Sequence, residues 1–194
     1  EQFIEHGFHN FIISTHFKAS MITDYFGDGG KWNVQIKYVH EKEPLGTAGA
    51  LGLLPKNMPD LPIIIMNGDI LTKVNFNELL EYHNKNKAIA TMCMRDYSFQ
   101  VPYGVLKIQK NTIIDIVEKP THNFFINAGI YVIDSKITSQ VNGLHYLDMP
   151  TLMTNQIELN ETVNSFPIHE YWMDIGRINE LNKANQEVAS MFNL

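Results

Sequence analysis

Through the first half of the chain, apolar runs bounded by turn-forming residues alternate with segments of helical periodicity. Short apolar or alternating runs predict strands at 11–14, 34–40, 63–66 and 88–94. Helical spacing predicts helices at 20–26, at 47–54, and from Asn75 or Asn77 to about 86. This alternation is typical of a parallel sheet covered by helices, so we predict an α/β fold.

The second half of the chain has a different pattern. Strands are predicted at 105–108, 113–117 and 125–133, with no full helix between them. Helices are predicted near the end of the chain, at 148–156 and 179–192. Strands that follow one another without a helical crossover pair most simply as antiparallel neighbours. We therefore expect a mixed or antiparallel section here.

Composition narrows the class of protein. The chain has 194 residues, 44% hydrophobic and 19% charged, which fits one soluble globular domain, 1–194. No apolar run approaches the ~20 residues that cross a bilayer, and the first residues are not a secretory signal, so we expect a cytoplasmic protein without a membrane partner. A net charge of −6 argues against nucleic-acid binding. The single cysteine, Cys93, lies in an apolar run and is predicted to be a buried hydrophobe.

Two aspartates stand at candidate strand ends. Asp69 follows the apolar strand 63–66 and Asn67-Gly68, and ligands of open α/β sheets gather at the carboxyl ends of strands. Taken alone, Asp69 could equally cap a turn. Asp174 precedes a glycine in the string 171–176, where it could instead cap a helix entry while Trp172 packs in the core. Both aspartates are candidate metal ligands.

A third polar cluster follows the predicted strand 113–117. Glu118-Lys119-Pro120 places a carboxylate and a cation side by side, and the segments 103–105 and 127–129 flank it in the sequence. An arbitrary Glu-Lys-Pro is more often a solvated turn. The chemistry of an acceptor beside a point charge nevertheless suits a phosphorylated, hydroxyl-rich ligand.

These motifs, in this order, resemble the sugar-1-phosphate nucleotidyltransferases. The string E-K-E-P-L-G-T-A-G-A-L-G-L-L at 41–54, the N-G-D at 67–69, the E-K-P at 118–120 and the W-x-D-x-G at 172–176 carry the resemblance. The first string looks most like guanylyltransferases that act on mannose- or amino-sugar-1-phosphates. The family's phosphate loop, G-G-x-G-T-R-L-x-P-x-T, would lie upstream of residue 1.

The resemblance implies a fold and a division of labour. It implies a Rossmann-like, mixed but mainly parallel sheet with helices on both faces, lacking its first strand and loop, so that the sheet is interrupted in its middle. The nucleotide-binding half would be 1–95 and the sugar-binding half 96–194.

The resemblance also implies roles for individual residues. Gly46 and Thr47 would wrap the nucleobase, and Asp69 and Asp174 would hold the Mg²⁺ that takes the triphosphate. Glu118 would accept hydrogen bonds from sugar hydroxyls, and Lys119 would meet the sugar phosphate as a catalytic cation. The remaining substrate contacts would come from Gly104, Asn127 and Trp172.

The base site allows a further hypothesis. Glu41 stands where relatives that use pyrimidine nucleotides have a glutamine, and Glu43 is a second carboxylate nearby. A carboxylate only accepts hydrogen bonds, which suits the two donors on the edge of guanine. The alternative is that both are exposed charges at a strand end.

The implied reaction transfers a nucleoside monophosphate from a nucleoside triphosphate, GTP on this reading, to a sugar-1-phosphate, giving a nucleoside diphosphate sugar and pyrophosphate. A catalytically incompetent nucleotide- or sugar-phosphate-binding or regulatory module is the alternative. A glycosyltransferase is disfavoured because Asp69-Ile70-Leu71 lacks the Asp-x-Asp that such enzymes present to a metal. The oligomeric state is left open, with a homo-oligomer as one outcome.

Overall fold

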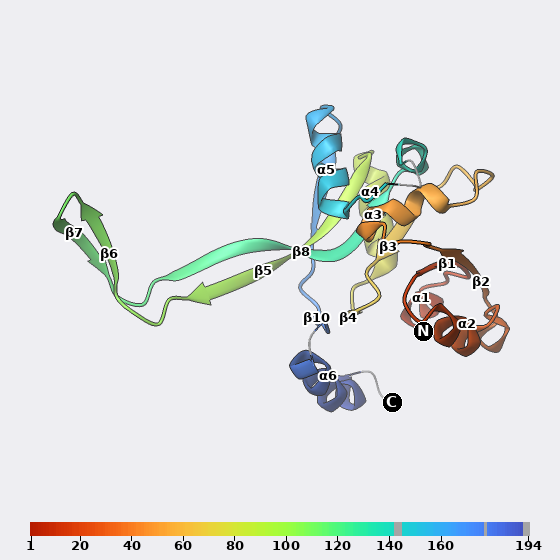
Figure 1. The fold of residues 1–194 in the computed structure, drawn as a ribbon, viewed down its shortest axis with the longest axis horizontal. Coiled ribbons are helices and arrows are strands. Elements are labelled where there is room, and N and C mark those ends of the chain that lie inside the picture. Colours follow the sequence, from red (N-terminus) through yellow and green to blue (C-terminus); the bar gives the residue numbers. More distant parts are fainter. Residues whose placement is uncertain (142–144, 177, 192–194) are drawn as a thin grey trace.

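The computed structural model describes residues 1–141, 145–176 and 178–191 (Figure 1). The helices are α1 (Gln2–Glu5), α2 (Ala19–Phe26), α3 (Gly46–Gly49), α4 (Phe76–Asn86), α5 (Met149–Glu158) and α6 (Ile178–Met191). The 3-10 helices are η1 (Gly30–Trp32), η2 (Ala50–Leu53) and η3 (Ser135–Gln140). The strands are β1 (Asn10–Thr15), β2 (Gln35–His40), β3 (Ile63–Met66), β4 (Ile70–Thr72), β5 (Ala90–Gln100), β6 (Val105–Gln109), β7 (Thr112–Val117), β8 (Thr121–Ile133), β9 (Val163–Pro167) and β10 (Trp172–Asp174).

A four-stranded sheet with the order β3-β8-β5-β9 forms the centre of the molecule. β8 runs antiparallel to both of its neighbours, while β9 runs parallel to β5. β1 and β2 form a separate parallel pair, and β4 and β10 a short antiparallel pair. The expected interruption of the sheet is present, because β1–β2 is not hydrogen-bonded to β3 within the described residues.

Helices cover both faces of the central sheet, as predicted. On β8 the side chains alternate, so Tyr131 and Ile133 pack in one buried cluster and Ile130 and Val132 in another. The first cluster includes residues of α5, and the second includes residues of α4. The α/β class is therefore confirmed.

Cys93 lies in the second of these clusters and is fully buried. Desolvation raises the pKa of its thiol to about 12, with a smaller contribution from the negative charge of Glu170. The thiolate form that a nucleophile needs is therefore disfavoured at neutral pH. The prediction that Cys93 is a buried hydrophobe is confirmed.

The sheet is less parallel than the resemblance implied. Of the described strand pairs, β1–β2 and β5–β9 are parallel and the others are antiparallel. The cause is β8, a 13-residue strand that returns from a hairpin and inserts between β3 and β5. The sequence predicted only its second part, from residue 125. The short strands β4, β9 and β10 were not predicted, because three to five residues carry too little periodicity.

The helix predicted at 47–54 is instead a single α-turn, α3, followed by η2. Two amides of this segment, Ala48 and Gly49, donate to the carbonyl of Leu147 at 2.8 and 3.0 Å. A distant segment thus satisfies donors at the start of the helix. The other predicted helices are present, and Asn75 caps α4 by accepting from the amides of Asn77 and Glu78.

β5 and β8 leave the body together and end in the β6–β7 hairpin, at the left of Figure 1. We call this extension, residues 96–125, the arm. Its side chains are exposed, including apolar ones such as Leu106, Ile108 and Ile116. Across the part of the chain that the structure describes, the helices are too short or too polar to cross a membrane.

Candidate active site

The structure brings Asp69 and Asp174 together, although they are far apart in the sequence. β10 pairs with β4 so that Asp174 lies opposite Ile70, the residue after Asp69. The amide of Ile175 donates to the backbone carbonyl of Asp69 at 2.8 Å. A Cβ placed on Gly176 would lie 3.1 Å from Asp174 Oδ1 and 3.8 Å from Asp69 Oδ2. Both carboxylates therefore border the small space that this glycine leaves.

This space suits a magnesium ion better than a metal held entirely by protein. Asp69 and Asp174 are both exposed. Among the described residues, no cluster of three or more His, Cys, Asp or Glu side chains could hold a metal. Mg²⁺ commonly takes one or two carboxylates and completes its octahedron with water and substrate phosphates. The carboxylate pair fits that chemistry.

Asp174 also has a local role. Its Oδ1 accepts from the amide of Gly176 at 2.9 Å, which closes a turn before α6. This resembles the alternative reading, in which the aspartate only organises a turn. The turn and a ligand role are compatible, because the bond fixes the direction in which the carboxylate points.

A β-bulge supports the strand end that carries Asp69. The pairing of β5 with β8 shifts between Met92 and Met94, and the extra residues on β8 include Ala128 and Gly129. Gly129 has a φ of +70°, and its carbonyl accepts from the amide of Asn67 at 3.0 Å. A Cβ on Gly129 would lie 2.9 Å from Asn67 Nδ2. The bulge thus packs directly against the turn that leads into Asp69.

Two predicted substrate residues hold this bulge in shape. Trp172 donates its indole N–H to the carbonyl of Ala128 at 2.8 Å. Asn127 accepts from the amide of Gly129 at 3.0 Å and donates to the hydroxyl of Tyr131. Their predicted contact with sugar stays a prediction, and the structure adds a supporting role for both.

The predicted base-reading carboxylates differ in their surroundings. Glu41 accepts from the hydroxyl of Ser14 on one oxygen, and from the amide of Leu45 at 2.9 Å on the other. Glu41 thereby ties β1 to the start of the glycine-containing loop. Glu43 is exposed. Of the two, Glu43 is thus the carboxylate that the loop itself does not employ in the bonds described.

Gly46 and Thr47 lie at the start of α3, against the N-terminus of α5. Gly46 has a φ of +77°, a backbone conformation that disfavours other residues. Ser14, Asn67 and Asp148 border the site but were not predicted. The sequence carried a signal only for Asp148, which stands at the predicted start of a helix.

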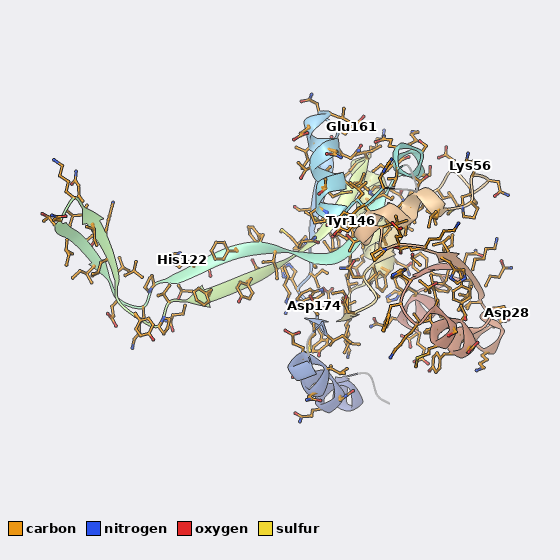
Figure 2. The ribbon with its side chains drawn as sticks, in the orientation of Figure 1. Asp28, Lys56, His122, Tyr146, Glu161 and Asp174 are labelled. Atoms are coloured by element: carbon orange, nitrogen blue, oxygen red, sulfur yellow. The ribbon has the colours of Figure 1, made fainter. Side chains whose placement is uncertain are left out.

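The sugar group lies apart from the aspartates. Gly104 and Glu118 are neighbours, since a Cβ on Gly104 would lie 2.9 Å from Glu118 Oε2. The amide of Lys119 donates to the carbonyl of Tyr103 at 3.3 Å. The structure thus assembles this predicted group, but it does so at the junction of the arm with the β6–β7 hairpin. Figure 2 shows His122 out on the arm and Asp174 beside the body.

The reason for the separation is the uninterrupted pairing of β5 with β8. From Met94 opposite Asn127 to Gln100 opposite Thr121, the two strands form a continuous ladder. This ladder carries Glu118 and Lys119 away from the body. In this conformation the structure does not bring Glu118 and Lys119 to Asp69 and Asp174.

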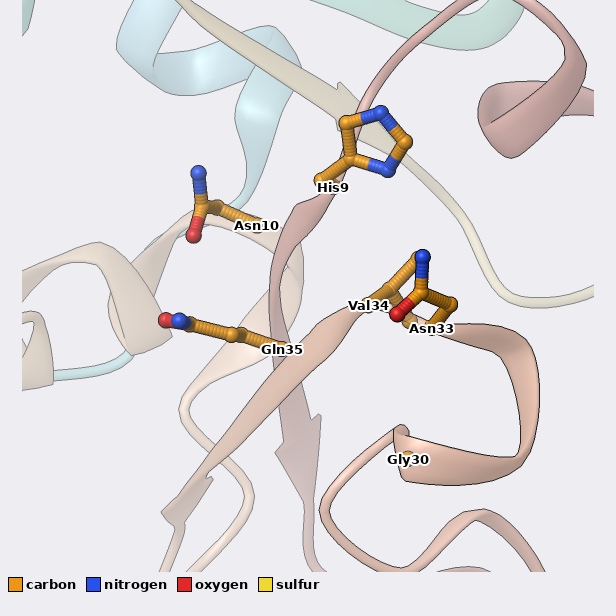
Figure 3. Close-up of a pocket in the computed structure, with 6 residues that line it drawn as sticks. All are labelled: His9, Asn10, Gly30, Asn33, Val34 and Gln35. Carbon is orange, nitrogen blue, oxygen red and sulfur yellow. The ribbon is translucent and has the colours of Figure 1, made fainter.

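A cavity of about 370 Å³ lies elsewhere, at the N-terminal ends of β1 and β2 (Figure 3). Its lining residues are His9, Asn10, Gly30, Asn33, Val34 and Gln35. These include no lysine or arginine that could offset the charge of a triphosphate. The cavity also lies at the opposite strand ends from Ser14 and Glu41, so it is not the predicted site.

The fold and the paired carboxylates fit the class of α/β proteins that hold phosphorylated ligands at the carboxyl ends of their strands. Comparison with known proteins defines the family. The family model described as nucleotidyl transferase matches residues 1–191. The chain therefore belongs to the nucleotidyl transferase family.

Individual relatives agree with this assignment. The chain is 34% identical over 153 residues to a mannose-1-phosphate guanyltransferase from Yarrowia lipolytica, covering 76% of this chain and 42% of that protein. It is 28% identical over 183 residues to a D-glycero-alpha-D-manno-heptose 1-phosphate guanylyltransferase from Aneurinibacillus thermoaerophilus, covering 94% and 79%. The crystal structure of HddC from Yersinia pseudotuberculosis has the same fold, with a TM-score of 0.70 at 24% identity over 96% of this chain and 81% of that one. The chain spans less than half the length of the Yarrowia protein and of similar relatives.

Proposed function

We propose that this chain provides the nucleotide- and metal-binding part of an enzyme that makes a nucleoside diphosphate sugar. A phosphate oxygen of a sugar-1-phosphate would attack the α-phosphorus of a nucleoside triphosphate. The new P–O bond forms as the bond to the β-phosphate breaks, and pyrophosphate leaves. The observation that carries the proposal is the meeting of Asp69 and Asp174 through the β4–β10 pair.

The chain's own residues have defined tasks in this proposal. Asp69 and Asp174 would hold Mg²⁺, which when bound neutralises phosphate charge and stabilises the leaving pyrophosphate. The loop 41–49 would hold the base. Positioning and charge neutralisation are the main sources of rate in such a transfer, so the enzyme needs no covalent intermediate.

We propose GTP as the nucleotide and a manno-configured sugar-1-phosphate as the acceptor. The printed activities of the Yarrowia and Aneurinibacillus relatives support both choices. A cytoplasmic location is part of the proposal, since both substrates are intracellular metabolites.

The test is pyrophosphate release by the product of the full coding sequence. The protein is incubated with Mg²⁺, each of the four common nucleoside triphosphates, and a panel of sugar-1-phosphates that includes mannose-1-phosphate. We expect release with GTP and one sugar, and loss of release when EDTA removes the metal. A folded protein that releases no pyrophosphate with any pair contradicts the proposal.

A binding or regulatory module is the second candidate, and the position of the arm favours it. Glu118 and Lys119 lie on the arm, apart from the aspartates, so the sugar group and the metal group do not form one site in this conformation. Under this alternative, calorimetry would detect nucleotide binding by a protein that shows no turnover.

The two glutamates of the base loop give a selective test. Glu43→Gln should reduce kcat/KM for GTP about tenfold relative to UTP, because one carboxylate that accepts from guanine is lost. Glu41→Gln should reduce kcat/KM for both nucleotides alike. A glutamine keeps only one acceptor oxygen, so either Ser14 or the Leu45 amide loses its partner. Steady-state kinetics with both nucleotides distinguish the cases, and a GTP-selective loss in Glu41→Gln alone would reverse the assignment.

A further inference from the structure

The loop that carries the predicted base contacts rests on a segment about a hundred residues further along the chain. We call residues 147–149, which lead into α5, the supporting segment. The amides of Ala48 and Gly49 both donate to the carbonyl of Leu147, at 2.8 and 3.0 Å. The amide of Leu147 in turn donates to the carbonyl of Leu45 at 2.8 Å. Backbone bonds therefore run in both directions between loop and segment.

Side chains add a reciprocal exchange at the same place. Asp148 Oδ1 accepts from the amide of Thr47 at 3.2 Å, across a separation of 101 positions. The hydroxyl of Thr47 accepts from the amide of Met149 at 2.8 Å. Thr47 thus satisfies an amide in the first turn of α5, and Asp148 satisfies an amide in the first turn of α3. Each helix start is capped by the other.

Asp148 is unusual for a residue at a helix start. It is the N-cap of α5, yet its side chain makes no cap bond to its own helix. Its second oxygen, Oδ2, accepts from the hydroxyl of Tyr146 at 2.9 Å. By contrast, Asp134 caps η3 in the ordinary way, accepting from Lys136 at 2.9 Å. The carboxylate of Asp148 serves the loop rather than its own helix.

The contact leaves no room between loop and segment. A Cβ on Gly46 would lie 2.7 Å from the carbonyl oxygen of Leu147 and 2.8 Å from Asp148 Oδ1. A Cβ on Gly49 would lie 3.0 Å from the carbonyl oxygen of His145. A displacement of Asp148 would therefore displace the backbone of the loop.

We propose that Asp148 is a positioning residue for nucleotide recognition: it fixes the loop 41–49 in the conformation that receives the nucleobase. This inference rests on the proposed function. Asp148 acts through Thr47 and Gly46 and does not touch the substrate. Its effect belongs to nucleotide binding rather than to the metal-dependent transfer step.

The test compares three variants in the product of the full coding sequence. Asp148→Ala removes both acceptor oxygens. Asp148→Asn keeps Oδ1 for the Thr47 amide, and its new amide group can donate to the Tyr146 hydroxyl. Asp134→Ala is the matched control, because it removes a cap carboxylate from a helix that does not contact the loop in the bonds described. Each variant is assayed for KM of the nucleotide, KM of the sugar-1-phosphate, and kcat.

In Asp148→Ala we expect the KM for the nucleotide to rise about tenfold, with kcat and the KM for sugar-1-phosphate within about twofold of the wild type. Asp148→Asn should recover most of the loss, and Asp134→Ala should lower the melting temperature without changing the nucleotide KM. Hydrogen exchange measured on the unliganded protein should speed up at residues 46–49 in Asp148→Ala alone.

The outcomes separate the two proposals. A wild-type protein without turnover refutes the proposed function and this inference with it. An active wild type whose Asp148→Ala variant keeps its nucleotide KM refutes the inference alone. Unchanged exchange at 46–49, or an equal rise of the nucleotide KM in Asp134→Ala, also refutes it, because the effect would then be absent or merely one of general stability.

Discussion

Turnover is expected to fall by about a thousandfold or more when either Asp69 or Asp174 is replaced by asparagine. Asparagine keeps the shape of aspartate but carries no charge, and Mg²⁺ selects anionic oxygen ligands. In the proposed reaction the metal neutralises the triphosphate, so its loss removes a stabilisation worth several kcal/mol in the transition state. Pyrophosphate release at saturating Mg²⁺ measures the effect.

The double variant makes this expectation sharper. Because Asp69 and Asp174 border one space, they should act as a unit, and Asp69→Asn with Asp174→Asn should be little worse than either single change. Asp96→Asn serves as the control, since Asp96 is an exposed carboxylate on the arm. Each variant should keep the melting temperature within a few degrees of the wild type. Retained turnover in either single variant would remove that aspartate from the metal site.

The metal pair shows what sequence reasoning can find. Motif order placed Asp69 and Asp174 together, although neither residue stands out alone. The β4–β10 pair that joins them was not predicted, because strands of three residues have no measurable period. The site was therefore predicted correctly in its residues, while the element that assembles it came only from the structure.

The base loop shows where such reasoning stops. The sequence predicted a helix at 47–54, since its spacing is helical, and the structure has one α-turn and a 3-10 turn there. Contact with Leu147 and Asp148 overrides the local preference. A bond across 101 positions leaves no trace in a single sequence, and for that reason Asp148 was predicted only as a helix start.

The arm is a third case, in which local structure was predicted and its placement was not. The strands at 105–108 and 113–117 are present, and Gly104 meets Glu118 as the motif order suggested. How far the ladder between β5 and β8 extends is set by pairing between strands, not by either strand alone. The length of that ladder determines how far the sugar group stands from the metal group.

Trp172 should prove important for both stability and turnover. Trp172→Ala should lower the free energy of unfolding by about 3 kcal/mol, because it removes a large half-buried ring that packs against the second core cluster. Trp172→Phe isolates the hydrogen bond. It keeps an aromatic ring but leaves the carbonyl of the fully buried Ala128 without its 2.8 Å donor, at a cost of about 1–2 kcal/mol.

The link to turnover runs through the bulge. If the carbonyl of Ala128 loses its partner, the neighbouring Gly129 can shift, and Gly129 supports the backbone of Asn67 just before Asp69. Trp172→Phe should therefore reduce kcat about tenfold, a larger loss than its modest cost in stability would cause in a protein still folded at the assay temperature.

Urea unfolding gives the stability term, and turnover well below the melting temperature gives the catalytic one. Trp32→Phe is the matched control, because Trp32 is the chain's other tryptophan and lies in η1, away from the aspartates in the sequence and in the sheet pairing. It should leave kcat unchanged. If Trp172→Phe loses stability but keeps its kcat, the bulge supports the fold without positioning Asp69, and the orientation of that carboxylate must then be set by the β4–β10 pair alone.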